Sequence, residues 1–174
     1  MRISHLVYSN FGGAGNVVLS LLNENKKNKK FQDSVIFTGP FFDRDYKKQI
    51  KNLKINSFFF VKTKRFFGFL SWLRVFKNLL IAKPKVILLH NYQIFPCFFY
   101  SLFFRTKIII IDHSALNFKS YRNYIVIFFI KYFKYHVAVL NKENLKFYLK
   151  NKVNVNRIHI INNGIDTNFY NKKK

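Results

Sequence analysis

Two kinds of apolar segment alternate along the chain. Short runs that are apolar at nearly every position predict buried strands, and these lie at residues 2–9, 33–39, 55–61, 85–90, 107–112, 136–140 and 156–163. Between them, apolar residues recur at helical spacing, at residues 16–25, 43–53, 65–83, 92–104, 121–135 and 141–151. Strands without a polar face, alternating with helices, are typical of a parallel sheet covered on both sides. The pattern therefore predicts an α/β fold with a Rossmann-like doubly wound parallel sheet, in one domain over residues 1–174.

Several residues mark the ends of the expected helices. Asp43 is placed to cap the helix at 43–53, because its carboxylate can accept a hydrogen bond from a free backbone N–H of the first turn. Pro84 ends the helix at 65–83, and Pro96 fits the first turn of the helix at 92–104.

Length and composition exclude a disordered chain and a disulfide-stabilised one. With 174 residues, of which 49% are hydrophobic, the chain can bury a core. Its one cysteine, Cys97, lies in an apolar run and is expected in the core, so no internal disulfide can form and a reducing compartment fits. No signal peptide is recognised. The apolar runs at 92–104 and 124–130 fall short of the roughly 20 residues that span a bilayer, and are expected to be buried helices or helices in a membrane interface.

The charge is strongly unbalanced, with 31 Lys and Arg against 7 Asp and Glu and a net charge of +24. Such a balance favours an anionic partner, either nucleic acid or a membrane surface. It is also what an AT-rich genome produces by codon bias, since Lys, Asn, Ile and Phe are abundant throughout. Both interpretations stay open at this point.

The predicted topology gathers the polar residues that follow the strands. In a doubly wound sheet, ligands bind beyond the carboxyl ends of the strands. The residues expected at that edge are Gly12, Gly13, Gly15, His90, Asn91, Asp112, His113, Ser114, Asn141, Lys142, Asn162, Asn163, Gly164 and Asp166.

The glycines after the first strand match neither of two familiar nucleotide-binding patterns. The dinucleotide fingerprint G-x-G-x-x-G, begun at Gly13, would need glycine where Val18 stands, and no Gly-Lys-Ser/Thr forms a P-loop. What remains is a glycine turn leading into a helix N-terminus. Its bare N–H groups can meet a phosphate or a sugar hydroxyl, or the segment is a tight turn without a ligand.

The five histidines do not suggest a metal site, because they are far apart in sequence and no Cys or Glu cluster accompanies them. Asp112, His113 and Ser114 are adjacent and would point in different directions, which disfavours a catalytic triad. Three histidines lie within or at the start of strands and are expected to be structural: His5, His136 and His159. His90 and His113 are the better functional candidates.

Five stretches, in this order and spacing, resemble the N-terminal half of glycosyltransferase family 4: "GGAG", "KPKVILLHN", "IIIIDHS", "VAVLNKENLKFYL" and "IHIINNGIDTNFY". The resemblance implies a GT-B fold, which has two Rossmann-like domains facing across a cleft. It also implies a retaining, metal-independent transfer of sugar from a nucleotide-sugar, which is a substrate and not a bound cofactor.

The resemblance also suggests residue roles. His113 corresponds to the active-site histidine that contacts the transferred sugar, and the glycine loop approaches the donor phosphates and the acceptor. The expected donor- and acceptor-binding residues are Gly12, Gly13, Gly15, His90, Asn163 and Gly164. The sequence departs from the family pattern at three points, where it has Pro84-Lys85, Asn141 and Asn162.

The expected function is thus that of a glycosyltransferase acting on a glycan or lipid-linked acceptor such as lipopolysaccharide, capsule or glycolipid. In the family, the C-terminal domain grips the nucleotide-sugar, and no such domain is recognised in residues 1–174. We therefore expect a truncated or split form that is inactive alone, with a separate donor-domain chain among its partners. The expected location is the cytoplasm, including the inner face of the membrane.

The alternative is a non-catalytic basic module that binds an anionic membrane or nucleic acid. Exposed aromatic side chains would favour stacking on bases. The aromatic residues in question are Phe58, Phe59, Phe60, Phe66, Phe67 and Phe69. They fall in segments predicted to pack into the core, so nucleic acid is not the expected partner.

Overall fold

The structure is a computed structural model, and it describes residues 1–9, 12–28, 30–53, 55, 57–63, 68–91, 93–113 and 121–161. The strands are β1 (Arg2–Tyr8), β2 (Gln32–Gly39), β3 (Ser57–Lys62), β4 (Val86–Leu89), β5 (Lys107–Asp112), β6 (His136–Val139) and β7 (Ile158–Ile160). The helices are α1 (Gly13–Asn28), α2 (Arg44–Asn52), α3 (Phe69–Ala82), α4 (Ile94–Phe103), α5 (Tyr121–Tyr132) and α6 (Lys142–Lys150), with a short 3₁₀ turn, η1 (Val155–Arg157).

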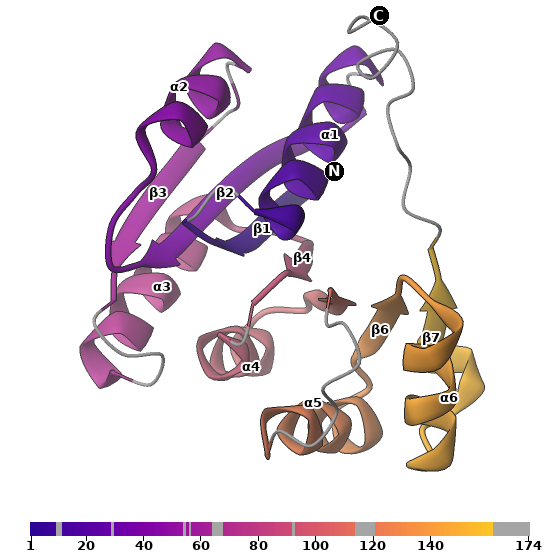
Figure 1. The fold of residues 1–174 in the computed structure, drawn as a ribbon. Helices are drawn as coiled ribbons and strands as arrows, with labels where there is room; N and C mark the ends of the chain where they lie inside the picture. The colour runs from indigo at the N-terminus through magenta and orange to yellow at the C-terminus, as the bar shows by residue number, and fades with distance from the viewer. Residues whose placement is uncertain are drawn as a thin grey trace, which may run out of the picture.

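The strands form one sheet of seven in the order β3-β2-β1-β4-β5-β6-β7. Every neighbouring pair is parallel. The order runs outward from β1 in one direction and then, from β4, in the other, so the topology reverses between β1 and β4 (Figure 1). This confirms the predicted Rossmann-like doubly wound sheet.

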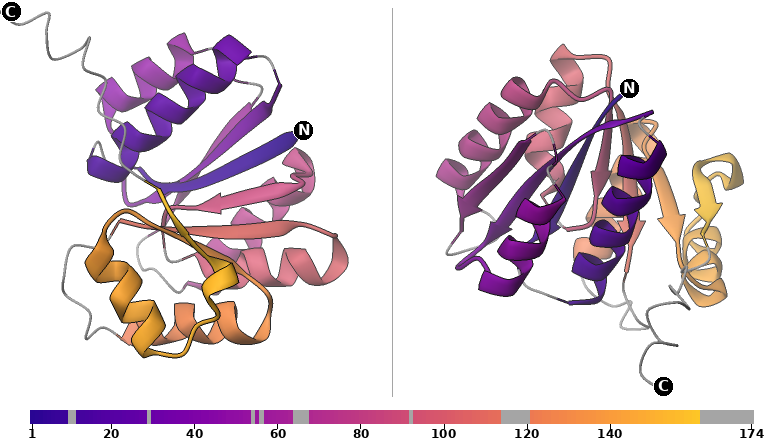
Figure 2. Two further views of the ribbon diagram at one scale, coloured as in Figure 1. Left: turned by 90° about the vertical axis from the view of Figure 1, so that its right-hand side faces the viewer. Right: turned by 90° about the horizontal axis from the view of Figure 1, so that it is seen from above.

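Helices cover the sheet on both sides and divide the core in two (Figure 2). Val7 of β1 and Phe37 of β2 pack with Tyr46 of α2 in the smaller core, under α1 and α2. Leu6 belongs to the larger core, which is packed under α3, α4, α5 and α6. Because successive residues of a strand point to opposite faces, Leu6 and Val7 tie β1 to both cores.

Most predicted boundaries agree with the structure. Asp43 caps α2 by accepting a hydrogen bond from the backbone N–H of Tyr46 at 2.9 Å, and Cys97 is buried in the larger core. The helix predicted at 16–25 begins earlier, at Gly13, so two of the three clustered glycines lie in its first turn. The last predicted strand, 156–163, is regular only at Ile158–Ile160 and is preceded by η1; residues 162 and 163 lie outside the described part.

The prediction for the phenylalanines is partly wrong. Phe58 and Phe59 are partly buried against the two cores. Phe60 is 39% exposed and Phe69 is 67% exposed, because β3 is an edge strand and Phe69 begins α3 on its outer side. Phe66 and Phe67 lie outside the described residues. Within the described part of the chain, no helix combines the length and the apolar character that crossing a membrane requires.

Gly39, the last residue of β2, differs from Gly12 and Gly13, which follow β1, in whether packing leaves room for a side chain. A Cβ atom added at Gly39 would lie 2.0 Å from Oγ of Ser9, whose hydroxyl donates to the carbonyl of Phe41. A Cβ atom at Gly12 or Gly13 would meet nothing within 4 Å, and neither residue has a positive φ. Packing therefore requires glycine at Gly39, whereas the protein's own atoms do not require it at Gly12 or Gly13.

This contrast gives a stability prediction. Gly39→Ala should lower the free energy of unfolding by about 1–3 kcal/mol, because the new methyl group overpacks against a hydrogen-bonded serine. Gly13→Ala should leave stability unchanged or raise it by up to about 1 kcal/mol, because alanine is the better helix former. Urea unfolding followed by circular dichroism compares the two. A destabilising Gly13→Ala would show that some contact in the folded chain does need the bare backbone there.

Candidate functional site

The candidate site lies where the strand order reverses. Parallel pairing brings the carboxyl ends of β1, β4 and β5 side by side. Gly12 and Gly13 come shortly after β1, His90 directly after β4 and His113 directly after β5. The four residues are therefore at the same edge of the sheet, as predicted, and a reversal of strand order at that edge is where doubly wound sheets bind ligands.

The histidines at this edge are in direct contact. Nδ1 of His90 lies 3.0 Å from Nε2 of His113, and the two rings stack with centroids 5.3 Å apart and an angle of 23° between their planes. The backbone N–H of His90 donates to the carbonyl of Leu6 at 2.8 Å, which continues the β1–β4 ladder by one residue. The sheet itself thus fixes His90, and His90 in turn contacts His113.

His5 adds a third ring to the stack. Its centroid lies 5.7 Å from that of His90, and its Nε2 is 3.3 Å from Oδ1 of Asp33 on β2. The same carboxylate oxygen accepts a hydrogen bond from the side chain of Asn25 on α1 at 3.1 Å. The predicted structural character of His5 agrees with its full burial, but its contact with His90 was not foreseen. The signal was the shared face: His5 pairs with Leu88, and His90 lies two residues further along the same face.

Burial makes both site histidines poor bases. It lowers the pKa of His90 well below its usual range, and the neighbouring rings of His5 and His113 lower it further. Burial also lowers the pKa of His113, and the carboxylate of Asp112 opposes that shift. Both imidazoles are therefore neutral at pH 7, so they act as hydrogen-bonding groups and not as cations.

Because both rings are neutral, only one of them can donate in the bond between them. Nε2 of His90 and Nδ1 of His5 are buried and have no hydrogen-bond partner among the described residues. A buried N–H without an acceptor is rarer than an unpaired acceptor, so we assign the proton of His90 to Nδ1, which donates to Nε2 of His113. His113 then carries its own proton on Nδ1, where it remains available to a ligand.

A pocket of about 230 Å³ adjoins the two histidines. It is lined by His90, Asn91, Ile110, Ile111, Asp112, His113, Asn123, Val126 and Tyr148. Asn91 is held in place, because its amide donates to Oγ1 of Thr38 at 3.0 Å and its carbonyl accepts from the backbone of Gln93 at 3.0 Å. The lining of the pocket thus combines polar groups with isoleucines.

Asp112 does not orient His113 in the manner of a catalytic triad. Its carboxylate accepts a hydrogen bond from the hydroxyl of Tyr148 on α6 at 3.0 Å, whereas His113 turns toward His90. Ser114 lies outside the described residues. The predicted divergence of these adjacent side chains is confirmed for Asp112 and His113.

The glycine segment contributes backbone to the same edge. No acidic side chain lies in the first turn of α1, so the partial positive charge of this helix end is not neutralised by its own residues. Gly15 is buried, and its carbonyl accepts a hydrogen bond from the hydroxyl of Tyr46 at 3.2 Å. Asn163, Gly164 and Asp166 lie outside the described residues, and their roles stay predictions.

The remaining polar candidates have other partners. His136 and His159 stack on each other, with Nδ1 and Nε2 2.9 Å apart, on β6 and β7. Asn141 caps α6 by accepting a hydrogen bond from the backbone of Asn144 at 2.7 Å. Within the described ranges, no cluster of three or more His, Cys, Asp or Glu residues could hold a metal ion.

Comparison with known proteins assigns the family. The sequence model of glycosyltransferase family 4 matches residues 11–169, which is nearly the whole chain. The chain belongs to glycosyltransferase family 4. No curated protein matches the sequence.

Solved structures agree at the level of the fold. The chain superposes on HepE from Anabaena, crystallised with UDP and glucose, with a TM-score of 0.72 at 16% identity over 98% of this chain and 46% of that one. It superposes on the lipopolysaccharide outer core galactosyltransferase WaaB with a TM-score of 0.72 at 13% identity, over 95% of this chain and 46% of that one. The chain superposes on a glycosyltransferase from Rickettsia africae with a TM-score of 0.66 at 12% identity, over 97% of this chain and 44% of that one.

These proteins are GT-B glycosyltransferases, and the family 4 chain spans about half the length of each. The predicted family and the predicted relation to one half of a GT-B fold are thus confirmed.

The buried His90 predicts a distinct pH dependence of stability. Its folded pKa is depressed, so below about pH 6.5 the unfolded chain binds a proton that folded His90 does not. Stability should therefore fall as the pH drops, by about 1.4 kcal/mol per pH unit for one such group. His90→Phe should remove that part of the slope in urea unfolding between about pH 7 and pH 5. His159→Phe is the matched control for losing a histidine; an equal loss of slope in both variants would mean that burial of His90 is not the cause.

Proposed function

We propose that this chain forms the acceptor-side wall of a glycosyltransferase cleft, in which a sugar passes from a nucleotide-sugar to a surface-glycan acceptor with retention of configuration. The main support for this proposal is the neutral His90–His113 pair, which lies at the same sheet edge as the glycine-rich N-terminus of α1. Family membership supports the reaction class, and the retaining course and the acceptor class follow the family resemblance.

The N-terminus of α1 suits the anionic part of the donor. Its first N–H groups have no partner within the helix, and Gly12 and Gly13 leave the space beside them open. Phosphates bind well at such helix ends, because the N–H groups and the helix dipole both favour negative charge. The open space explains why glycine occurs at two positions where the folded chain alone does not need it.

His113 suits the sugar. Transfer breaks the bond between the anomeric carbon and the nucleotide phosphate, forms a bond to the acceptor oxygen, and releases the proton of the acceptor hydroxyl. A neutral imidazole that lines the pocket and carries its proton on Nδ1 can donate to a sugar hydroxyl and so hold the ring in position for this exchange. His90 keeps His113 in that tautomer, which makes it a positioning residue rather than a group that touches the sugar.

The other wall of the cleft would come from a donor-binding domain, in the same protein or in a partner chain. Related GT-B structures are about twice as long as this chain. The described residues offer a histidine pair and a helix terminus to the nucleotide-sugar, which leaves most of the nucleotide in water. Donor affinity should therefore be poor without the second wall.

The activity test compares the 174-residue chain alone and with a separately expressed family 4 donor domain. The chain alone should give no measurable transfer from a panel of nucleotide-sugars to lipid-linked and glycan acceptors, measured by release of nucleoside diphosphate. Where the two chains together are active, His113→Ala should reduce kcat/KM by about a hundredfold, the scale for losing one positioned donor. His159→Ala serves as the matched control.

Robust transfer by the chain alone, abolished by His113→Ala, would contradict the need for a second wall. Transfer that is equally affected by His113→Ala and His159→Ala would contradict the assignment of the site.

A further inference from the structure

Four polar side chains lie on a regular diagonal across one face of the sheet. They are Asp33 on β2, His5 on β1, His90 after β4 and His113 after β5. Each lies one strand over and two residues further toward the carboxyl edge than the one before it, as the registers of β2 with β1, β1 with β4 and β4 with β5 require. Steps of two residues keep side chains on the same face of a sheet. We call these four residues the Asp33–His113 row.

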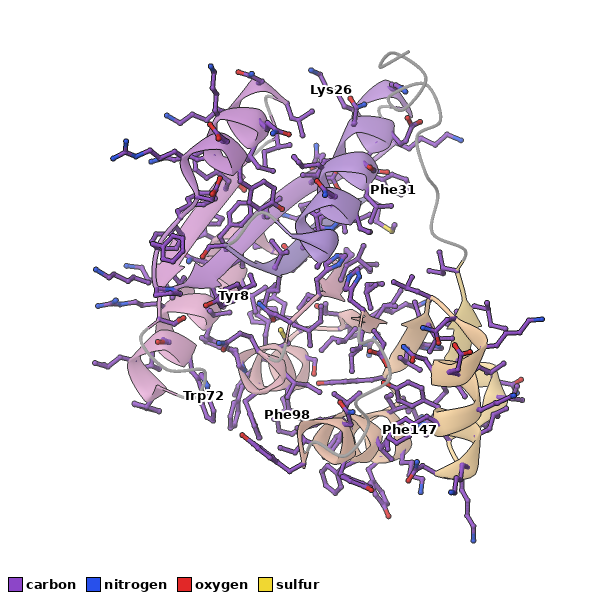
Figure 3. All side chains as sticks on the ribbon, viewed as in Figure 1. Tyr8, Lys26, Phe31, Trp72, Phe98 and Phe147 are labelled. Carbon is purple, nitrogen blue, oxygen red and sulfur yellow. The ribbon has the colours of Figure 1, made fainter. Side chains whose placement is uncertain are left out.

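The Asp33–His113 row connects the amino side of the sheet with the candidate site. In Figure 3, Phe31 marks the amino end of β2 and Tyr8 marks the carboxyl end of β1. The row begins at Asp33, two residues after Phe31, and ends at His113, which lines the pocket at the carboxyl edge. The buried interior of the sheet is therefore linked to the site by titratable groups.

The same diagonal step joins another pair of histidines. His159 pairs with Ala138, which lies two residues beyond His136, so His159 is one strand over and two residues on from His136. Nδ1 of His136 is 2.9 Å from Nε2 of His159, with ring centroids 5.1 Å apart. In the row, Nδ1 of His90 is 3.0 Å from Nε2 of His113, with centroids 5.3 Å apart. In both pairs the earlier ring contributes Nδ1 and the later ring contributes Nε2.

The step from His5 to His90 is a third instance of this geometry. The two ring centroids are 5.7 Å apart and the ring planes differ by 21°, so this pair is only slightly wider than the two bonded pairs. By the same rule, Nδ1 of His5 is the atom that belongs next to Nε2 of His90. These are the two histidine nitrogens that are buried without a hydrogen-bond partner among the described residues. A single proton between them gives both a partner.

The carboxylate of Asp33 indicates where that proton comes from. Asp33 is 6% exposed, and a buried carboxylate is normally paired with a cation. Its Oδ1 accepts from the amide of Asn25 at 3.1 Å and lies 3.3 Å from Nε2 of His5, which is its only ion-pair partner within the described ranges. The groups that face His5 are thus Asp33 from β2, His90 from the end of β4 and, beside Asp33, the uncharged Asn25 from α1.

We propose that His5 carries a proton on both ring nitrogens and that His5 and Asp33 thereby fix the tautomer of His113. Nε2–H of His5 donates to Asp33, and Nδ1–H of His5 donates to Nε2 of His90. Because His90 accepts at Nε2, it keeps its own proton on Nδ1 and donates to Nε2 of His113, which leaves the proton of His113 on Nδ1. His5 and Asp33 are therefore positioning residues. That role rests on the proposed function of His113, whereas the protonation of the row does not.

Loss of one proton would reverse the direction of every bond between the rings. The Nδ1 proton of His5 moves to Nε2 of His90, the Nδ1 proton of His90 moves to Nε2 of His113, and the Nδ1 proton of His113 passes to water in the pocket. The row has then released one proton in total. His113 would present a lone pair at Nδ1 in place of an N–H group. The proton on His5 thus decides whether His113 donates to a sugar hydroxyl or accepts from one.

The experiment observes the histidine rings of the 174-residue chain, labelled with ¹⁵N-histidine, by NMR at pH 7. Two-bond proton–nitrogen correlations distinguish a cationic ring from each of the two neutral tautomers, and single substitutions of the histidines assign the signals. We expect His5 to be cationic, and His90 and His113 to be neutral with the proton on Nδ1. This reading needs no ligand, no second domain and no variant of Asp33.

Asp33→Asn tests the origin of this arrangement, because it removes the charge and preserves the size of the side chain. We expect His5 to become neutral and the proton of His113 to move from Nδ1 to Nε2. Asp45→Asn, which removes an exposed carboxylate from α2, is the matched control and should leave all five histidines unchanged. Where the chain and a donor domain together are active, Asp33→Asn should lower kcat/KM by about tenfold or more, the scale for losing a group that orients an imidazole. Circular dichroism verifies that both variants fold.

Two results would overturn the proposal. One is a neutral His5 at pH 7 in the unaltered chain, which can be read even if Asp33→Asn does not fold. The other is a folded Asp33→Asn variant in which His5 stays cationic or His113 keeps its proton on Nδ1. The expected ring states together with no transfer by the combined chains would instead contradict the proposed function, so the two failures are distinguishable.

Discussion

The parallel pairing of β1 with β4 is the constraint on which the rest of the molecule depends. The chain makes β2 and β3 on one side of β1, and must then return past β1 to place β4 on its other side. The pairing runs from Ile3 opposite Val86 to Leu6 opposite Leu89, and the bond from the backbone N–H of His90 to the carbonyl of Leu6 at 2.8 Å extends it. Because of this return, α1 and α2 cover one face while the later helices cover the other, and the ends of β1 and β4 meet without a helix filling the gap between them.

The polar stack at this junction follows from the same pairing. His5, His90 and Asp33 are buried groups that would destabilise an apolar core without hydrogen bonds or contacts of their own. The sheet places them in line, so that Asp33 accepts from His5, His5 stacks on His90 and His90 contacts His113. Among the residues that the structure describes, Nδ1 of His5 and Nε2 of His90 find no hydrogen-bond partner. A row of stacked imidazoles with incomplete hydrogen bonding suits a site that holds one side chain in one tautomer better than it suits simple packing.

Much of the fold was predictable from the sequence, because most strands are apolar on both faces and helices alternate with them along the chain. The edge location of His90 and His113 was predictable for the same reason: a polar residue directly after a buried parallel strand must lie at the carboxyl edge. The contact of His5 with His90 was not, since it depends on the register between β1 and β4, and a shift of one residue would turn His5 to the other face. The need for glycine at position 39 could not be predicted either, because it comes from contact with Ser9, which lies thirty residues earlier in the sequence.

The exposed rings of α4 and α5 could not be separated from core rings by sequence pattern. In "YIVIFFIKY" the inward Ile127 and Ile130 and the outward Phe128 are equally apolar, so the helical period carries little contrast. The positions of the acidic residues distinguish these helices from the others instead. Codon bias toward lysine would add cations without regard to position. It does not explain why carboxylates are missing from the whole of α3, α4 and α5, while Asp43 caps α2 and Asp45 and Glu143 lie in α2 and α6. The distribution of the few acidic residues, more than the number of basic ones, therefore distinguishes this side of the molecule from the rest.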